Sequence, residues 1–192
     1  MTDSPPAQQP CPWYEAVRGE SLAQGDILTD VRFPVLTGPF DDWQTMTSVP
    51  AEWVVNTVVI LSQSCDLDIE HGEAESVIVC PMYSTEAIKE QHLAKKPYSA
   101  KDLTNRVEHI RKGNQPALHM LPPCRLPEHR RDTVIVNFWQ TTTVPLQLIR
   151  AIVAAMDWRL RLLPPYREHL GQAFARFVMR VGLPQNFQSE NN

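Results

Sequence analysis

Apolar and β-branched positions in the first hundred residues predict three β-strands. Residues 25–36 alternate apolar and polar side chains, the period typical of a strand with one covered face, and Pro34 makes the far end an edge or a break. Residues 53–62 are a continuous β-branched run, which predicts a strand buried on both faces. Residues 76–83 give the third strand.

The pattern after residue 84 predicts four helices and two further strands. Ser99 and Asp102 have the spacing of a capping box, and Gly113 stops the helix that they begin. The last helix is apolar on one face, so it either covers an open end of the sheet or docks a partner. The predicted helices span residues 85–94, 99–113, 146–156 and 165–182, and the strands span 117–121 and 132–146.

These elements predict a mainly β fold with helices, of the α+β class. We expect a Pro-rich disordered tail over residues 1–12, one domain over 13–184 that includes a C-terminal helical extension (146–184), and a second disordered tail over 185–192. No apolar run is long enough for a membrane span, and the start lacks the features of a signal peptide. Because the four cysteines form no C-x-x-C pair, a cytoplasmic protein is expected.

Charge is distributed unevenly along the chain. Residues 1–100 carry 5 Lys or Arg against 15 Asp or Glu, whereas residues 101–192 carry 13 against 7. A basic C-terminal part suits an acidic protein partner or nucleic acid, but the net charge of −4 disfavours general nucleic-acid affinity. Arginine and aromatic side chains dominate protein interfaces, so we predict a partner-binding surface there. Its residues are Trp158, Arg159, Arg161, Tyr166, Arg167, Arg176, Phe177 and Arg180.

Several short motifs together resemble the MazF/PemK (Kid) family of toxin-like proteins. They are GDI followed by V-x-F-P, then VVILSQS, then VIVCP, and finally TVIVNFWQTTTVPLQLI, within residues 24–155. The resemblance implies a compact SH3-like β-barrel with small helices, usually dimeric, and RNA cleavage without a metal. It also implies an arginine just before the strand that VVILSQS matches, and a Thr or Ser at the start of the next strand.

This sequence departs from that family at the residues the reaction needs. Attack by a 2′-hydroxyl on phosphate requires a base and a fixed cation. Asn56 stands about where the arginine is expected, no Lys or Arg occurs from Val35 through Ile88, and acidic residues precede Ser76. We therefore expect a barrel without RNase chemistry that acts as a regulatory or inhibitory subunit of a bacterial toxin–antitoxin or phage-defence operon, bound to a protein encoded nearby. The alternative is an active RNase in which Arg32 or Arg106 supplies the cation and Ser62 or Ser64 assists.

Cys65 is the second open question, because it ends the β-branched run in the motif SQSCD. As a nucleophile it would need His71 or His119 as a base, with Asp66 orienting that base. Favoured instead is a buried, structural cysteine, with Asp66 accepting hydrogen bonds from backbone N–H groups of the following loop. A metal site from Cys65, Asp66, His71 and His119 or Cys80 is the weakest alternative, so no metal or cofactor is predicted.

The sequence around the other aromatic and histidine side chains predicts whether they are buried or exposed. Phe138 and Trp139, in the strongest strand pattern, are expected in the core. The remaining histidines, His92, His109, His129 and His169, are expected at the surface.

Overall fold

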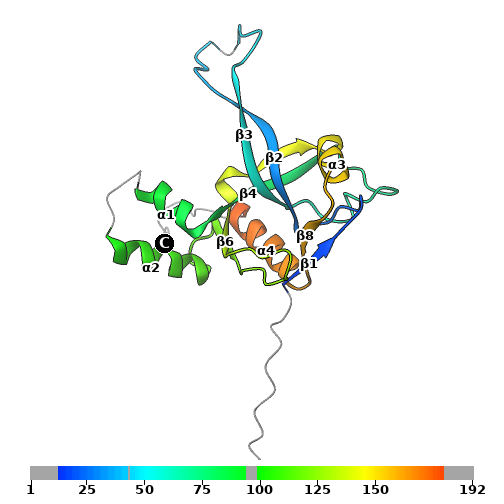
Figure 1. The fold of residues 1–192 in the computed structure, drawn as a ribbon. Coiled ribbons are helices and arrows are strands. Elements are labelled where there is room, and N and C mark those ends of the chain that lie inside the picture. The colour runs from blue at the N-terminus through cyan, green and yellow to red at the C-terminus, as the bar shows by residue number, and fades with distance from the viewer. Residues whose placement is uncertain (1–12, 43, 94–98, 180–192) are drawn as a thin grey trace, which may run out of the picture.

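The chain folds as a mixed α+β structure in which helices pack on both faces of an antiparallel sheet (Figure 1). The structure is a computed structural model that describes residues 13–42, 44–93 and 99–179. Within them the sheet has eight strands: β1 (Tyr14–Val17), β2 (Asp26–Leu36), β3 (Ala51–Ile60), β4 (Ser76–Ser84), β5 (Leu118–Leu121), β6 (Val134–Asn137), β7 (Thr142–Pro145) and β8 (Arg159–Leu162). The same residues form four α-helices, α1 (Thr85–Leu93), α2 (Ala100–Arg111), α3 (Leu146–Ala154) and α4 (Tyr166–Val178), and one 3-10 turn, η1 (Phe138–Gln140).

The strand order is β1-β8-β2-β3-β4-β6-β5, and β7 also pairs with β4. β6 and β7 pair with successive parts of β4, and η1 lies between them in the chain. The 3-10 turn thus divides what would otherwise be one strand antiparallel to β4. β1 and β5 lie at opposite ends of this order, and in the described part of the chain the sheet is open between them. The predicted α+β class is thereby confirmed.

Two apolar clusters cover the two faces of the central strands. Val58 and Ile60 of β3 pack in the cluster that contains Ile149 of α3, whereas Val59 points into the cluster that contains Leu170 of α4. Val58, Val59 and Ile60 are fully buried, as the continuous apolar run predicts. A third, smaller cluster joins α1 and α2 to β6.

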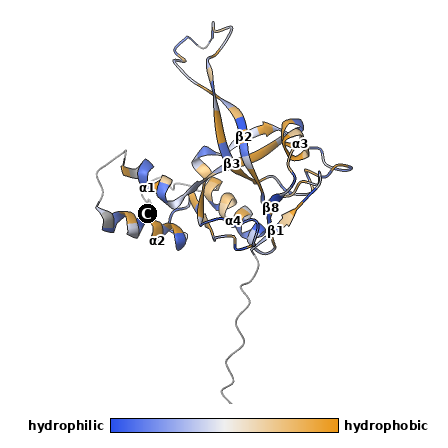
Figure 2. Ribbon diagram, in the orientation of Figure 1, coloured by the Kyte–Doolittle hydropathy of each residue, from blue (hydrophilic) through white to orange (hydrophobic). Residues whose placement is uncertain are grey.

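The outer half of the β2–β3 hairpin leaves the body of the molecule (Figure 1). A β-bulge between Leu28 and Val31 separates this half from the base, and Asp30 adopts a positive φ of 55° there. Figure 2 shows hydrophobic as well as hydrophilic residues along the projecting strands. The prediction that β3 is buried on both faces is therefore wrong for its outer half, where Trp53 is 70% exposed.

The predicted helices and strands are present, but the strand predicted over residues 132–146 is divided in two. Ser99 and Asp102 form the predicted capping box of α2, with the Ser99 Oγ accepting from the Asp102 N–H at 3.2 Å. The predicted strand over 132–146 is broken at η1, because the Asn137 side chain accepts a hydrogen bond from the Trp139 N–H (3.2 Å). As a result Phe138 is buried as predicted, whereas Trp139 is 68% exposed.

The C-terminal segment is more than a helical extension. β8 lies between β1 and β2, so residues 146–184 supply a strand of the sheet as well as α3 and α4. Neither β1 nor β8 was predicted. The proposed tails at 1–12 and 185–192, and the predicted end of the last helix, lie outside the described residues. Among the residues that are described, no helix is long and apolar enough to cross a membrane.

Candidate functional site

The turn that follows β3 uses its hydroxyl groups to hold the fold together. Ser62 Oγ accepts a hydrogen bond from the Ile78 N–H at 2.8 Å, which links this turn to β4. Ser64 Oγ accepts from the Gln24 N–H at 3.1 Å, and the Gln24 amide donates to the Leu61 carbonyl at 2.8 Å. Both serines predicted to assist RNA cleavage thus satisfy backbone groups of neighbouring segments.

Cys65 is exposed, which contradicts the favoured prediction that it is buried. Its Sγ lies 3.5 Å from Asp66 Oδ1, and within the described residues no hydrogen bond joins it to a histidine. A nucleophilic cysteine needs a base within hydrogen-bond reach, so this geometry gives Cys65 no activating partner among the described residues.

The carboxylate that organises the following loop is Asp68. Its Oδ1 accepts hydrogen bonds from the Glu70 and His71 N–H groups, both at 2.9 Å. These bonds lower the pKa of Asp68, with the His71 bond contributing most. The predicted role of Asp66 is therefore carried out two residues later, because Asp68 stands at the start of the turn.

The two histidine candidates are separated. His71 is exposed and its Nδ1 lies 3.2 Å from Asp68. His119 lies on β5 with its ring near Phe138, and burial, with a smaller contribution from His169, lowers its pKa to about 4. No group of three His, Cys, Asp or Glu side chains in the described residues is placed to hold a metal ion.

The cations proposed for RNA cleavage also lie on separate elements. Arg32 is exposed on β2 and pairs with Val55 of β3. Asn56 pairs with Val31, so its side chain lies on the opposite face of the hairpin from that of Arg32. Arg106 belongs to α2 and lines a cavity of about 170 Å³ beside Asn137. No hydrogen bond in the described residues links either arginine to Ser62 or Ser64.

Arg159 and Arg161 are engaged inside the fold, and this changes the predicted partner surface. Asp26 is fully buried at the start of β2. Its carboxylate accepts hydrogen bonds from Arg159 Nε at 2.7 Å and from Arg161 Nη2 at 3.0 Å. Both guanidinium groups also donate to the Ser21 carbonyl. With Arg159 only 2% exposed, the structure does not place it at a surface where a partner could reach it.

This ion-pair network has a sequence signal that was missed. Charged residues that alternate with leucine in RLRL place Arg159 and Arg161 on the same face of a strand. A carboxylate inside an apolar strand start such as GDI has to be paired if it is buried. The partner lay more than 130 positions away, so neither motif could identify the other.

The other residues of the predicted surface mostly contact their own chain. Trp158 lies against His129 with ring centroids 3.7 Å apart, and Tyr166 stacks on Trp13 at 3.5 Å. Arg167 pairs with Glu168, and Phe177 packs on Phe138. Arg176 is exposed, and Arg180 lies outside the described residues.

Exposed apolar side chains gather instead on the hairpin. They belong to β2, β3 and the loop between them, and are Val35, Leu36, Phe40, Val49, Trp53 and Val55. Because residues opposite each other in an antiparallel pair share a face, Trp53 and Pro34 lie together beside Val55 and Arg32. Exposed apolar side chains that share a face in this way mark an interaction site more often than scattered ones do.

No family model, curated protein or solved structure matches the chain. Function therefore has to be argued from the site itself.

Proposed function

We propose that this chain is a protein-binding module, a divergent MazF/PemK-like barrel of the SH3-like kind that lacks RNase chemistry. It acts as a regulatory or inhibitory subunit in a bacterial toxin–antitoxin or phage-defence operon. The operon and the barrel come from the resemblance of the sequence motifs. The bulge in β2 supports a strongly curved sheet, because bulges bend strands and increase their twist. The observation that carries the binding role is the exposed apolar surface of the β2–β3 hairpin.

The backbone of the outer hairpin also favours a partner. β2 pairs with β8 only at Asp26 and Ile27, and β3 pairs with β4 only from Val58 to Ile60. Beyond these positions each strand of the ribbon pairs only with the other, within the described residues. A two-stranded ribbon is marginally stable alone, and its free edges can accept an added strand.

Charge indicates the chemistry of the partner. Asp41, Asp42 and Glu52 are exposed on the hairpin, and Arg32 is the single Lys or Arg in the sequence of residues 26–57. The fitting occupant is a partner segment that presents apolar side chains flanked by basic ones. A groove of about 640 Å³ at the foot of the hairpin, lined in part by Val35, Val54 and Tyr83, lies on the other face of the ribbon, because Val35 and Val54 alternate with Leu36 and Trp53 along their strands.

Binding to the protein products of neighbouring genes tests this proposal. Each product is purified, and its affinity is measured by titration calorimetry for wild type and for the double variant Leu36→Ser/Trp53→Ser. We expect the double variant to weaken binding about tenfold or more, since exposed aromatic anchors carry much of the energy of an interface. Ile69→Ser is the matched control, because Ile69 is exposed and lies outside the hairpin.

Two outcomes would contradict the hairpin assignment. One is unchanged affinity of the double variant. The other is a loss of binding that occurs only in Arg167→Glu/Arg176→Glu, which would place the interface on the basic C-terminal surface instead.

The absence of RNase chemistry is tested separately. Purified protein is incubated with a mixed-sequence RNA in EDTA, and no cleavage is expected because the site lacks a fixed cation near a base. Cleavage that Arg32→Ala or Arg106→Ala removes would establish the endoribonuclease alternative. Cleavage removed by Cys65→Ala would point to the thiol enzyme.

A further inference from the structure

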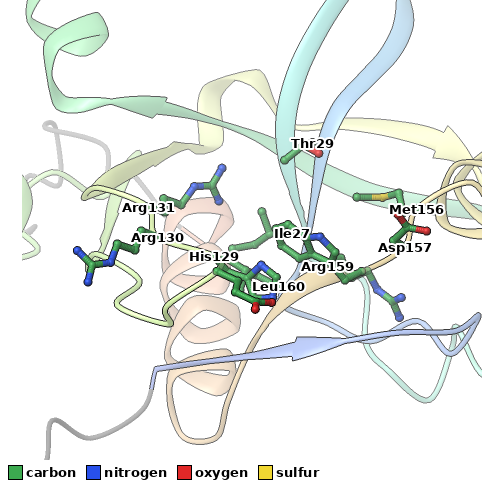
Figure 3. A pocket seen from close by; sticks show the side chains of 11 residues that line it. Ile27, Thr29, His129, Arg130, Arg131, Met156, Asp157, Arg159 and Leu160 are labelled. Atoms are coloured by element: carbon green, nitrogen blue, oxygen red, sulfur yellow. The ribbon is translucent and has the colours of Figure 1, made fainter.

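A cavity of about 450 Å³ lies beside the base of the hairpin (Figure 3). Ile27 and Thr29 of β2 form one wall, and Met156 to Leu160, leading into β8, form another. The loop from Glu128 to Arg131 closes the remaining side. The volume is in the range of sites that hold small organic ligands.

Two buried nitrogen atoms of this loop have no hydrogen-bond partner among the described residues. They are Nη1 of Arg131 and Nδ1 of His129. Buried polar groups are nearly always hydrogen-bonded, and leaving one unmet is costly, most of all when it is charged. Burial also lowers the pKa of Arg131, which is the effect of a charge removed from water.

The fold holds both side chains in place. Backbone bonds between Cys124 and Arg131, at 2.9 and 3.1 Å, fix the end of the loop. The His129 ring lies against Trp158, and the backbone N–H of His129 donates to the Leu126 carbonyl at 3.0 Å. His129 is therefore half-buried, where the sequence predicted a surface residue. An arrangement fixed before binding loses little entropy when a ligand enters.

The acidic side chains of the lining do not neutralise Arg131. Glu128 and Asp157 are exposed, and no ion pair joins either of them to Arg131 in the described residues. Figure 3 shows Asp157 on the far side of the cavity from Arg131, next to Met156. In the same view Arg130 points away from the cavity, while the Arg131 side chain extends toward the side where Thr29 lies. Arg159, although it contributes to the wall, is engaged by Asp26.

We propose that this cavity binds a small organic oxyanion, a phosphate or a carboxylate carried on a compact apolar or aromatic group. The guanidinium of Arg131 pairs with the oxyanion, as arginine does with carboxylates and phosphates. His129 Nδ1 supplies a second polar contact. Ile27, Leu160 and Met156 then surround the apolar part of the ligand.

Calorimetric titration of the full chain with four compounds at physiological ionic strength tests this site. Phenyl phosphate and benzoate carry an oxyanion on a ring, inorganic phosphate carries the charge alone, and benzyl alcohol carries the ring alone. We expect saturable binding of at least one ring-bearing oxyanion, with inorganic phosphate about tenfold weaker and benzyl alcohol weaker still. Whichever of phenyl phosphate and benzoate binds more tightly identifies the preferred oxyanion.

Variants connect the binding to the cavity. Arg131→Gln should weaken binding about tenfold or more, because it removes a charged partner of the anion. Arg125→Gln is the matched control, since Arg125 is an exposed arginine outside the lining, and it should change the affinity by less than about twofold. Thr29→Trp leaves Arg131 intact but fills the cavity from an exposed position on β2, so it should also abolish binding.

Three results would overturn the site. One is the absence of binding of both ring-bearing oxyanions up to about 10 mM, which is weaker than a specific small-molecule site requires. Another is equal weakening by Arg131→Gln and Arg125→Gln, which indicates attraction by net charge alone. The third is binding of benzyl alcohol as tight as that of phenyl phosphate, because the anion would then play no part.

Discussion

The base and the outer half of the β2–β3 hairpin belong to the same two strands but have opposite surroundings. At the base, Leu28 and Val58 are fully buried, and the carboxylate of Asp26 is enclosed by two arginines. In the outer half, Leu36 and Trp53 are similarly apolar and remain exposed. Apolar side chains at the base are explained by the fold, whereas those of the outer half are explained only by something that covers them.

The largest contrast concerns the carboxylates. Asp26→Ala leaves Arg159 and Arg161 without their buried counter-charge, so we expect the free energy of unfolding to fall by about 3–5 kcal/mol. Asp41→Ala, at an exposed position in the hairpin loop, should change it by less than about 0.5 kcal/mol. Urea unfolding of both variants measures the difference, and equal stability would mean that the network contributes little.

Leucines of one strand provide the next contrast. Leu28→Ala empties a fully buried site and should lower the free energy of unfolding by about 3 kcal/mol. The same substitution at Leu36, which is 61% exposed, should lower it by less than about 0.5 kcal/mol in the isolated protein. Denaturant midpoints of the two variants give the comparison directly. A large loss in Leu36→Ala would show that the chain itself covers the outer hairpin.

Local sequence patterns were sufficient to predict those helices and strands whose own residues carry the signal. The capping box of Ser99 and Asp102 predicted the start of α2, and the apolar run of β3 predicted its buried end. Such signals were insufficient for β1 and β8, because neither four-residue strand carries the run of β-branched side chains that marks the others. Their position in the sheet depends on pairing between Tyr14 and Leu162 across most of the chain.

The candidate site was less predictable because its chemistry depends on long-range contacts. The sequence predicted that Arg159 and Arg161 would lie at a partner-binding surface and that Cys65 would be buried. In the structure Arg159 is buried and Cys65 is exposed. An arginine that aligns with an enclosed carboxylate becomes structural, and that alignment is set by the register between β2 and β8. Exposure of an apolar residue such as Trp53 likewise depends on where the neighbouring strands end.

Histidines extend the contrast between enclosed and exposed side chains to pH. Burial lowers the pKa of His119 to about 4, below its ordinary value of 6.5, so the folded state favours the neutral ring. The unfolded chain then takes up the proton first as the pH falls, and stability decreases between about pH 6.5 and 4. His119→Phe should therefore reduce the stability difference between pH 7 and pH 4.5 by about 2 kcal/mol.

His109→Phe is the control for that measurement, because His109 is exposed on α2. Carboxylates titrate in both variants, so only the difference between each variant and wild type is compared. If His119→Phe keeps the full pH dependence of wild type, protonation of His119 is not linked to folding.

Cysteines give the smallest effect on stability and the clearest separation in reactivity. Cys65 is exposed, whereas Cys80 is buried, its Sγ donates to the Asn137 carbonyl at 3.0 Å, and burial raises its pKa to about 12. Iodoacetamide at pH 8, followed by peptide mass spectrometry, should label Cys65 at least about a hundredfold faster than Cys80, since only an accessible thiolate reacts. Cys65→Ala should leave the free energy of unfolding within about 0.5 kcal/mol of wild type, because no packing is lost at an exposed position. Comparable labelling of both thiols in the native protein would show that β4 opens readily, and a large loss of stability in Cys65→Ala would restore the structural role that its sequence context suggests.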